Sequence, residues 1–245
     1  MRTNGNLQSR ESEKRASSPS GYDVALFAER LAQAKPDEII AEAAKAMPGR
    51  LAVVSSFGTE SAVLLKLVAD VNPSLPILFL DTLWLFKETL AYRDALVARL
   101  GLTDVRTITP SPSALALRDA KRDLCFRDRD ACCDIRKVAP LANELEPFDG
   151  WISGRKRYHG GERAAVAVVE TDGHRLKFNP LAHLTSAELN AIFDTADLLR
   201  HPLEALGFTS AQRLAITDQR PTQRPSQSVK PWWSRLAGIS GAART

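Results

Sequence analysis

Apolar and polar residues alternate with two different periods along the middle of the chain. Short apolar runs at residues 51–55, 75–80 and 105–108 have the length and composition of buried strands. The segments between these runs, 60–71 and 85–100, carry apolar residues at the spacing of amphipathic helices. Strands that alternate with helices form mainly parallel sheets. The pattern therefore predicts an α/β fold, a mainly parallel sheet with helices on both faces.

Similar patterns extend the domain on both sides of this series. Residues 22–47 have helical spacing, which Pro36 divides into two helices. A capping box formed by Thr185 and Glu188 indicates the start of another helix. We further expect a mobile polar loop at 110–130, a helix at 131–145, a strand at 151–153, and a hairpin of 166–170 and 175–178 around Asp172-Gly173.

The two ends of the chain differ in composition from the middle. Residues 1–21 are rich in Ser, Arg, Glu and Asn and have no apolar period, so we expect a disordered arm. Residues 211–245 form a basic tail rich in Pro and Gln, which we also expect to be disordered. The folded domain is therefore expected to span residues 22–210.

Composition narrows the class of protein. A hydrophobic content of 44% in 245 residues suits one sizeable core. The sequence shows neither the apolar run of a membrane helix nor a secretory signal, and its three cysteines do not make a disulfide framework, so we expect a cytoplasmic protein without a membrane partner. The tail holds six basic residues and one acid, against a net charge of +4 for the chain. Because the body is near neutral, nucleic acid is not an expected partner.

One candidate site lies where the first predicted strand passes into a helix. Backbone N–H groups at a helix N-terminus have no partner within the helix and attract anions. Small hydroxyl residues and a glycine at this turn suit an oxyanion ligand, although an ordinary capped turn has the same composition. The candidate binding residues are Ser55, Ser56, Gly58, Thr59, Glu60 and Ser61.

Two further candidate segments also follow predicted strands. Asp81 and Thr82 end the second strand, and open α/β sheets bind ligands at the carboxyl ends of neighbouring strands. The segment 154–163 holds three arginines and a lysine among glycines, and guanidinium groups match phosphate or sulfate oxygens. A helix cap and a solvated loop are the plainer alternatives.

A fourth segment combines thiols and cations on one helical turn. Neighbouring cysteines rarely bond each other, so the pair is either incidental core or part of a site that needs two thiolates close together. The residues of this segment are Cys132, Cys133, Asp134, Ile135, Arg136 and Lys137.

In order and spacing, these four segments closely resemble the adenylyl-sulfate (APS) reductase branch of the phosphoadenylyl-sulfate (PAPS) reductase family. The similarity runs from about residue 51 to residue 208, and the Asn-Pro-Leu at 179–181 and the His-Pro-Leu at 201–203 fit it too. The adjacent cysteines are its most discriminating feature, because family members that use the 3′-phosphorylated substrate lack them. The resemblance implies a fold similar to the adenine-nucleotide α-hydrolases.

The resemblance also implies a substrate site for adenylyl sulfate. The loop 55–61 would hold the phosphate region of the nucleotide, and Asp81 and Thr82 would lie near the adenosine. Arg155 and Arg163 would face the phosphosulfate. The remaining substrate-binding residues that we expect are Arg136, Gly154 and Gly161.

A cofactor follows from the same resemblance. Cys132 and Cys133 would supply two of the four ligands of a 4Fe-4S iron-sulfur cluster, whose usual ligands are thiolates. Lys137 would support catalysis from a position between the cluster and the substrate, where an ammonium group tunes the electrostatics of the cluster.

The implied reaction is thioredoxin-dependent reduction of adenylyl sulfate, a step of sulfate assimilation and cysteine biosynthesis. In the family, a C-terminal cysteine thiolate attacks the sulfur, releases AMP and leaves an enzyme thiosulfonate. Thioredoxin or a similar dithiol protein then releases sulfite by exchange at sulfur. The implied enzyme is an oxidoreductase, and a homo-oligomer is compatible with this reading.

The sequence departs from the family in two places. The family takes its other two cluster ligands from a Cys-x-x-Cys segment and its nucleophile from a C-terminal Cys-Gly-x-His, but no cysteine follows Cys133 here. We read Cys125 as a free loop cysteine, hypothesise a reading-frame change near codon 211, and expect the chain as it stands to be inactive. The second departure is Leu83-Trp84, where the family usually has a glycine after Asp-Thr.

Three alternative functions are compatible with parts of the pattern. A PAPS reductase would act on the 3′-phosphorylated nucleotide. An ATP pyrophosphatase of the same superfamily uses a Ser-Gly-Gly-x-Asp-Ser loop, from which Phe57 and Glu60 depart. A non-catalytic nucleotide-binding remnant would keep the pocket without redox chemistry, and this alternative gains most if the tail is genuine.

Overall fold

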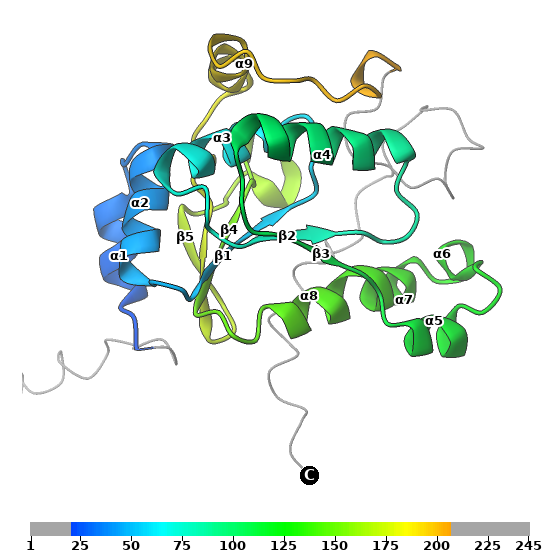
Figure 1. Ribbon diagram of the computed structural model, residues 1–245. Coiled ribbons are helices and arrows are strands. Elements are labelled where there is room, and N and C mark those ends of the chain that lie inside the picture. The colour runs from blue at the N-terminus through cyan, green and yellow to red at the C-terminus, as the bar shows by residue number, and fades with distance from the viewer. Residues whose placement is uncertain (1–20, 207–245) are drawn as a thin grey trace, which may run out of the picture.

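The computed structural model describes residues 21–206, and within them six strands form one sheet in the order β3-β2-β1-β4-β6-β5 (Figure 1). Four of the neighbouring pairs are parallel, and only β5 runs antiparallel to its neighbour β6. The strands are β1 Leu51–Ser55, β2 Ile77–Leu80, β3 Val105–Ile108, β4 Gly150–Ser153, β5 Val169–Asp172 and β6 Arg175–Phe178. The predicted sheet and the predicted hairpin are confirmed.

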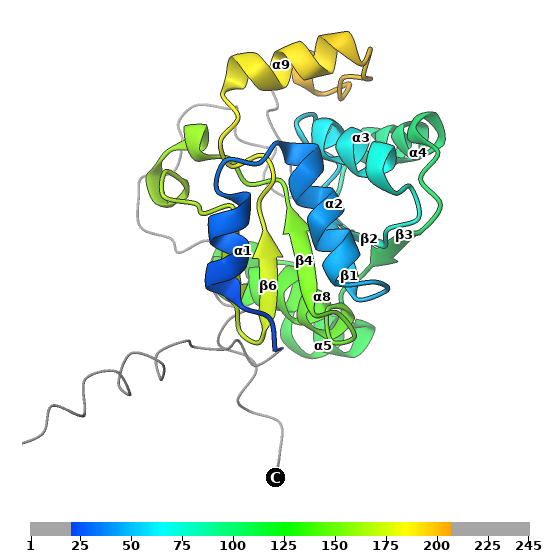
Figure 2. The same cartoon turned by 90° about the vertical axis from the view of Figure 1, so that its left-hand side faces the viewer.

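Helices cover both faces of the sheet. Successive side chains of a strand point to opposite faces, so the apolar strands present apolar side chains on each face. Leu51 and Val53 of β1 face the larger core, and Ala52 between them faces the smaller one. Figure 1 shows α3 and α4 on the side of the sheet opposite to α8, and Figure 2 shows α1 and α2 beside β4 and β6. The larger core is covered by α1 Val24–Leu31, α2 Pro36–Ala46, α3 Ser61–Val71, α4 Lys87–Leu100 and α9 Ser186–Thr195, and the smaller core by α8 Ala139–Glu144.

Local sequence signals explain where several helices begin and end. Pro36 is the first residue of α2, where its missing N–H costs nothing. Gly101 ends α4 in the left-handed conformation, with a φ of 64°. Thr185 and Glu188 form the predicted capping box at the start of α9. Over residues 21–206 we find no helix with the length and apolarity that crossing a membrane requires.

The region between β3 and β4 differs from the prediction. The segment 110–130, expected to be a loop, contains the helices α5 Pro112–Arg118 and α6 Leu124–Arg127, so this prediction was wrong. Ser111 caps α5, and the buried carboxylate of Asp119 accepts the N–H of Leu124 at the start of α6. The expected helix at 131–145 consists of α7 Arg129–Cys133, a π-helical turn η2 Asp134–Val138, and α8. The arm before residue 21 and the tail at 211–245 lie outside the described residues.

Candidate functional site

The order of the strands reverses at β1, and a pocket opens there. From β1 the chain adds β2 and β3 on one side of the strand, and β4 and β6 lie on its other side. Ligands of open α/β sheets bind at such switch points, beyond the carboxyl ends of the strands. A pocket of about 270 Å³ lies beyond the ends of β1 and β4. Its lining residues are Val54, Ser55, Ser56, Gly58, Thr59, Glu60, Ser61, Leu80, Trp151, Ser153, Gly154, Arg155, Lys156, His159 and Arg163.

The loop after β1 forms one wall of this pocket, in a strained conformation. Phe57 has a backbone φ of 50°, which residues other than glycine rarely adopt. Its N–H donates to Oγ of Ser55 at 3.1 Å. Its ring is fully buried and packs edge-to-face against Phe79, with 5.3 Å between the ring centroids. Packing under the sheet edge therefore holds the turn in place, and the hydroxyl residues on both sides of Phe57 line the pocket.

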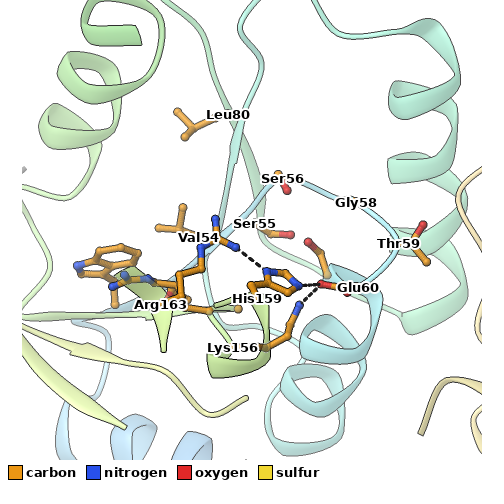
Figure 3. Close-up of a pocket in the computed structure, with 15 residues that line it drawn as sticks. Val54, Ser55, Ser56, Gly58, Thr59, Glu60, Leu80, Lys156, His159 and Arg163 are labelled. Atoms are coloured by element: carbon orange, nitrogen blue, oxygen red, sulfur yellow. Dashed lines mark hydrogen bonds and ion pairs between the residues drawn. The ribbon is translucent and has the colours of Figure 1, made fainter. Parts of the chain in front are cut away.

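Glu60 lies in the pocket, where Figure 3 shows its bonds to Lys156 and His159, and it also accepts a hydrogen bond from Tyr158. Lys156 Nζ is 2.5 Å from Oε2, His159 Nε2 is 2.9 Å from the same oxygen, and the Tyr158 hydroxyl donates to Oε1 at 2.6 Å. Burial is the largest single effect and raises the pKa of Glu60. The attraction and hydrogen bond of Lys156, the hydrogen bond of Tyr158 and the charge of His159 together outweigh it, so the resulting pKa is below the usual value. The carboxylate therefore carries its charge at neutral pH.

Lys156 is almost fully buried, with 3% of its surface exposed. Desolvation lowers the pKa of its ammonium group, and the charge of Glu60 offsets part of this change. A buried ammonium group needs an anionic partner, because burying an isolated charge is costly. In this structure Glu60 is that partner.

His159 links Glu60 to Arg163, as Figure 3 shows. Arg163 donates to Nδ1 of His159 at 2.6 Å, so the neutral ring carries its proton on Nε2 and donates it to Glu60. Burial lowers the pKa of His159, which favours this neutral form. Burial, together with the nearby charge of Arg155, also lowers the pKa of Arg163. The wall thus presents guanidinium and ammonium groups that a bound oxyanion could engage.

A buried polar network supports the floor of the pocket. Glu170 accepts from Arg155 at 3.2 Å and from Lys177 at 3.3 Å. The Lys177 ammonium group lies 4.8 Å from the ring centroid of Trp151, and Ser153 donates to Asn179 at 2.5 Å. These contacts connect β4 with the hairpin β5–β6 and hold the base of the basic segment 154–163.

Comparison with known proteins identifies the family. The model of the phosphoadenosine phosphosulfate reductase domain matches residues 50–211. The chain belongs to this reductase family. It is 46% identical over 177 residues to the adenosine 5′-phosphosulfate reductase of Mesorhizobium japonicum, covering 72% of this chain and 70% of that protein. It is 43% identical over 198 residues to the enzyme of the same name from a Chelativorans species, covering 80% of this chain and 77% of the relative.

Further relatives place the fold. The phosphoadenosine 5′-phosphosulfate reductase of Gloeobacter violaceus is 37% identical over 179 residues, covering 71% of this chain and 74% of that protein. A phosphate complex of the phosphoadenylyl-sulfate reductase from Candida auris has a TM-score of 0.66 at 21% identity, covering 79% of this chain and 95% of that one. The FMN adenylyltransferase of Candida glabrata reaches 0.52 at 16% identity, covering 95% and 80%. The expected likeness to adenine-nucleotide α-hydrolase folds is confirmed.

In this family member the turn after β2 repeats the geometry of the turn after β1. Asp81 Oδ1 accepts the N–H of Leu83 at 2.8 Å, and Leu83 has a φ of 61°. Glycine adopts this φ without strain, which accounts for the usual family glycine at this position. Asp81 and Thr82 border the site but do not line the pocket. Their expected contact with adenosine stays a prediction.

Only some of the other predicted substrate residues line the pocket. Gly154, Arg155 and Arg163 line the pocket. Gly161, with a φ of 58°, belongs to the short turn η4 Gly161–Arg163 and does not line it. Arg136 is 2% exposed, outside the lining, and its guanidinium group pairs with Asp119. The substrate contacts of Gly161 and Arg136 therefore stay predictions.

The two adjacent cysteines end α7. Cys132 is fully buried and packs with Trp84, Leu124 and Ile135, and Cys133 is partly exposed. Lys137 follows on η2. Across residues 21–206 we find no group of three or more His, Cys, Asp or Glu side chains that could hold a metal ion. Since a four-iron cluster takes four ligands, these two thiols do not complete such a site within the described part of the chain.

Sequence reasoning missed several residues of the pocket. Lys156 and His159 belong to the basic segment already singled out, and their spacing of three residues in a turn could have indicated a shared face. Trp151 and Ser153 are two positions apart on β4, and residues at this spacing in a strand point to the same side of the sheet. Val54 and Leu80 are apolar strand residues that gave no signal.

Proposed function

We propose that the protein reduces adenylyl sulfate to sulfite and AMP, with thioredoxin or a similar dithiol protein as the electron donor. The observation that carries this proposal is the pocket at the switch point, where the loop 55–61 faces the basic segment 154–163. The names of the relatives from Mesorhizobium japonicum and Chelativorans support it. A dithiol donor fits a reducing cytoplasm, in which we place the enzyme.

The charges of the pocket suit a phosphosulfate group. Arg155, Lys156 and Arg163 are three cations on one wall, and Glu60 is the one carboxylate among the lining residues. Guanidinium forks match the oxygens of phosphate and sulfate, and they gain strength where water is excluded. In this proposal the anionic substrate shares Lys156 with Glu60, while Ser55 and Thr59 offer hydroxyl groups from the opposite wall.

Adenylyl sulfate is the substrate that we favour over its 3′-phosphorylated analogue. The two relatives named adenosine 5′-phosphosulfate reductase are 46% and 43% identical to this chain. The relative from Gloeobacter violaceus, named for the 3′-phosphorylated substrate, is 37% identical. That relative keeps phosphoadenylyl-sulfate reduction as the second candidate function.

The proposed reaction needs a cysteine thiolate as nucleophile. The thiolate attacks the sulfate sulfur, the bond between sulfur and the phosphate oxygen breaks, and AMP leaves with the electron pair. One thiolate of the dithiol protein then attacks the cysteine sulfur and displaces sulfite, and its second thiol closes a disulfide, so the dithiol supplies the two electrons. No cysteine follows Cys133 in this sequence. We therefore propose that the chain as it stands binds the nucleotide without turning it over.

We further propose that Cys132 and Cys133 are two ligands of a four-iron four-sulfur cluster. Adjacent thiols at the end of a helix, one buried and one partly exposed, support this assignment. Such a cluster would supply electrostatic influence beside the substrate. Lys137, four residues after Cys133, would lie between the cluster and the substrate.

Two measurements test the proposed function. Calorimetric titration should show that the chain binds adenylyl sulfate more tightly than its 3′-phosphorylated analogue. Sulfite release with thioredoxin should occur only in a variant to which the Cys-x-x-Cys and the terminal Cys-Gly-x-His have been restored. Failure to bind either nucleotide, or release of pyrophosphate from ATP, would overturn the proposal.

A further inference from the structure

Arg136 connects its own helical turn with two other segments, the turn after β2 and the residues between α5 and α6. Its guanidinium carbon lies 3.7 Å from the ring centroid of Trp84. One terminal nitrogen donates to the backbone carbonyl of Thr82 at 2.9 Å, and the other pairs with Oδ2 of Asp119 at 2.5 Å. We refer to Trp84, Asp119 and Arg136 as the Arg136 cluster.

The Arg136 cluster is almost completely buried. The side chains of Arg136 and Asp119 are 2% and 0% exposed, and Trp84 is 4% exposed. Burying an ion pair is costly because each ion loses its water, and further hydrogen bonds offset part of this cost. The second oxygen of Asp119 accepts the N–H of Leu124 at 2.8 Å, whereas the buried Nε of Arg136 has no hydrogen-bond partner among the described residues. Arginine suits this place because its planar group can stack on a ring and donate along its edges at once.

This cluster lies where the cysteine-bearing region meets the sheet. The helices α5, α6 and α7 lie next to α8 on one side of the sheet (Figure 1), and they carry all three cysteines of the sequence. Thr82 and Trp84 follow β2 directly, at the edge of the sheet where the pocket opens. The ring of Trp84 also packs with the buried Cys132 in one apolar group.

We propose that Trp84 and Arg136 are positioning residues, which fix Cys132 and the neighbouring Lys137 against the turn at the end of β2. In this proposal Arg136 acts through Thr82 and Trp84, in place of the direct substrate contact that the sequence led us to expect. This inference rests on the proposed function in one respect. The proposed function supplies the reason for fixing the cysteines, which is to hold them at a set distance from the bound substrate.

The test uses metal-free, reduced protein and two readouts. The first is the rate at which N-ethylmaleimide alkylates Cys132, resolved by fragment mass spectrometry from Cys133 and Cys125, which are partly exposed and act as internal references. The second is the affinity for AMP. In Arg136→Lys and Trp84→Leu, alkylation of Cys132 should accelerate about tenfold or more, since local opening becomes easier. In Trp84→Leu the affinity for AMP should stay within about twofold, because Trp84 does not line the pocket.

Two further variants sharpen the result. Trp84→Phe keeps an aromatic face for stacking and should restore most of the protection of Cys132. Arg118→Lys is the matched control, because Arg118 pairs with Asp134 in the same region but 44% of its side chain is exposed. We expect no change in this control. Melting curves identify any variant that fails to fold, and the conservative Trp84→Phe and Arg136→Lys keep the test informative in that case.

Distinct outcomes separate this inference from the proposed function. Unchanged protection of Cys132 in folded Arg136→Lys and Trp84→Leu would overturn the positioning role. An affinity for AMP that falls about tenfold in Arg136→Lys alone would also overturn it, since a direct nucleotide contact would explain that loss. If the unaltered chain binds neither AMP nor adenylyl sulfate, the proposed function fails, while the alkylation result still decides the positioning role.

Discussion

Glu60 and Lys156, 96 positions apart in the chain, meet at 2.5 Å between Oε2 and Nζ inside the pocket. They meet because β1 and β4 are parallel neighbours, so the loops that follow these strands face each other. Burial lowers the pKa of Lys156, and the attraction of Glu60 raises it again. A cation buried in this position needs an anionic partner both in the free protein and in the substrate-bound protein. Glu60 serves in the free protein, and the substrate is expected to share this role when bound.

Replacing Lys156 should therefore weaken nucleotide binding. A hydrogen bond to a charged group contributes about 1.5–3 kcal/mol, so Lys156→Met should lower the affinity for adenylyl sulfate by roughly ten- to a hundredfold. Calorimetric titration measures this directly. The matched control is Lys66→Met, because Lys66 pairs with Asp70 on α3 and does not line this pocket. Equal affinities for the two variants would show that Lys156 has no part in binding.

Leu83 offers a test of the strained turn after β2. Its φ of 61° costs about 1–2 kcal/mol for a residue with a Cβ atom, and glycine would remove this strain. Glycine also gives the unfolded chain more conformational freedom, which destabilises the folded state by about 0.5–1 kcal/mol. Because the two effects nearly cancel, Leu83→Gly should change the free energy of unfolding by less than about 1 kcal/mol.

Leu26 provides the comparison for this measurement, since both side chains are 48% exposed. Leu26 lies within α1, where glycine relieves no strain and costs about 1 kcal/mol of helix propensity. Urea unfolding of both variants should therefore show a larger loss for Leu26→Gly. The explanation by strain fails if Leu83→Gly is the more destabilised of the two.

The parts of the fold that the sequence predicted have strong local periods. The alternation from Leu51 to Ile108 specified both the strands and the helices between them, and Pro36 located the break between α1 and α2. The region around Asp119 was mistaken for a loop, because its polar composition hides a buried carboxylate that caps one helix and pairs with Arg136. Such a long-range ion pair leaves no periodic signal.

The site was predicted in its segments and missed in its pairings. The two loops were identified because hydroxyl, glycine and arginine residues follow strands. Glu60 was expected to bind substrate, but its bond to Lys156 depends on the neighbouring positions of β1 and β4. The order of strands in a sheet is a tertiary property, and the sequence pattern alone gave only the strands themselves.

A histidine near the end of the described residues should make stability depend on pH. Nδ1 of His201 accepts the N–H of Leu203 at 3.2 Å, so the neutral ring carries its proton on Nε2, 3.1 Å from Oγ1 of Thr89. Protonation of Nδ1 would place two N–H groups against each other. Burial lowers the pKa of His201, although Glu204 and Glu88 partly counteract this effect, and the Tyr92 ring packs against the imidazole.

The sign of this pH dependence follows from the lowered pKa. Below a pH of about 6.5, the usual value for histidine, His201 binds a proton more readily in the unfolded chain than in the folded one. The stabilising contribution of neutral His201 is therefore present above that pH and is lost as the pH falls through the folded pKa, at no more than about 1.4 kcal/mol per pH unit. Urea unfolding between pH 8 and pH 5 should show a shallower slope for His201→Asn than for the unaltered protein. Replacing His174, on the turn between β5 and β6, is the control, and an unchanged slope in His201→Asn would contradict this account.

Iron loading distinguishes the proposed cluster ligands from an incidental pair of cysteines. Two thiols cannot hold a four-iron cluster by themselves, so the chain as it stands should stay colourless after anaerobic reconstitution with iron and sulfide. A variant with restored C-terminal cysteines should take up about four iron atoms per chain and absorb visible light. Within that variant, Cys132→Ser or Cys133→Ser should abolish the colour, and Cys125→Ser, the matched control, should keep it. If the Cys132→Ser protein loads iron as fully as the control, the buried thiol is part of the apolar group with Trp84 and Leu124 and has no role as a ligand.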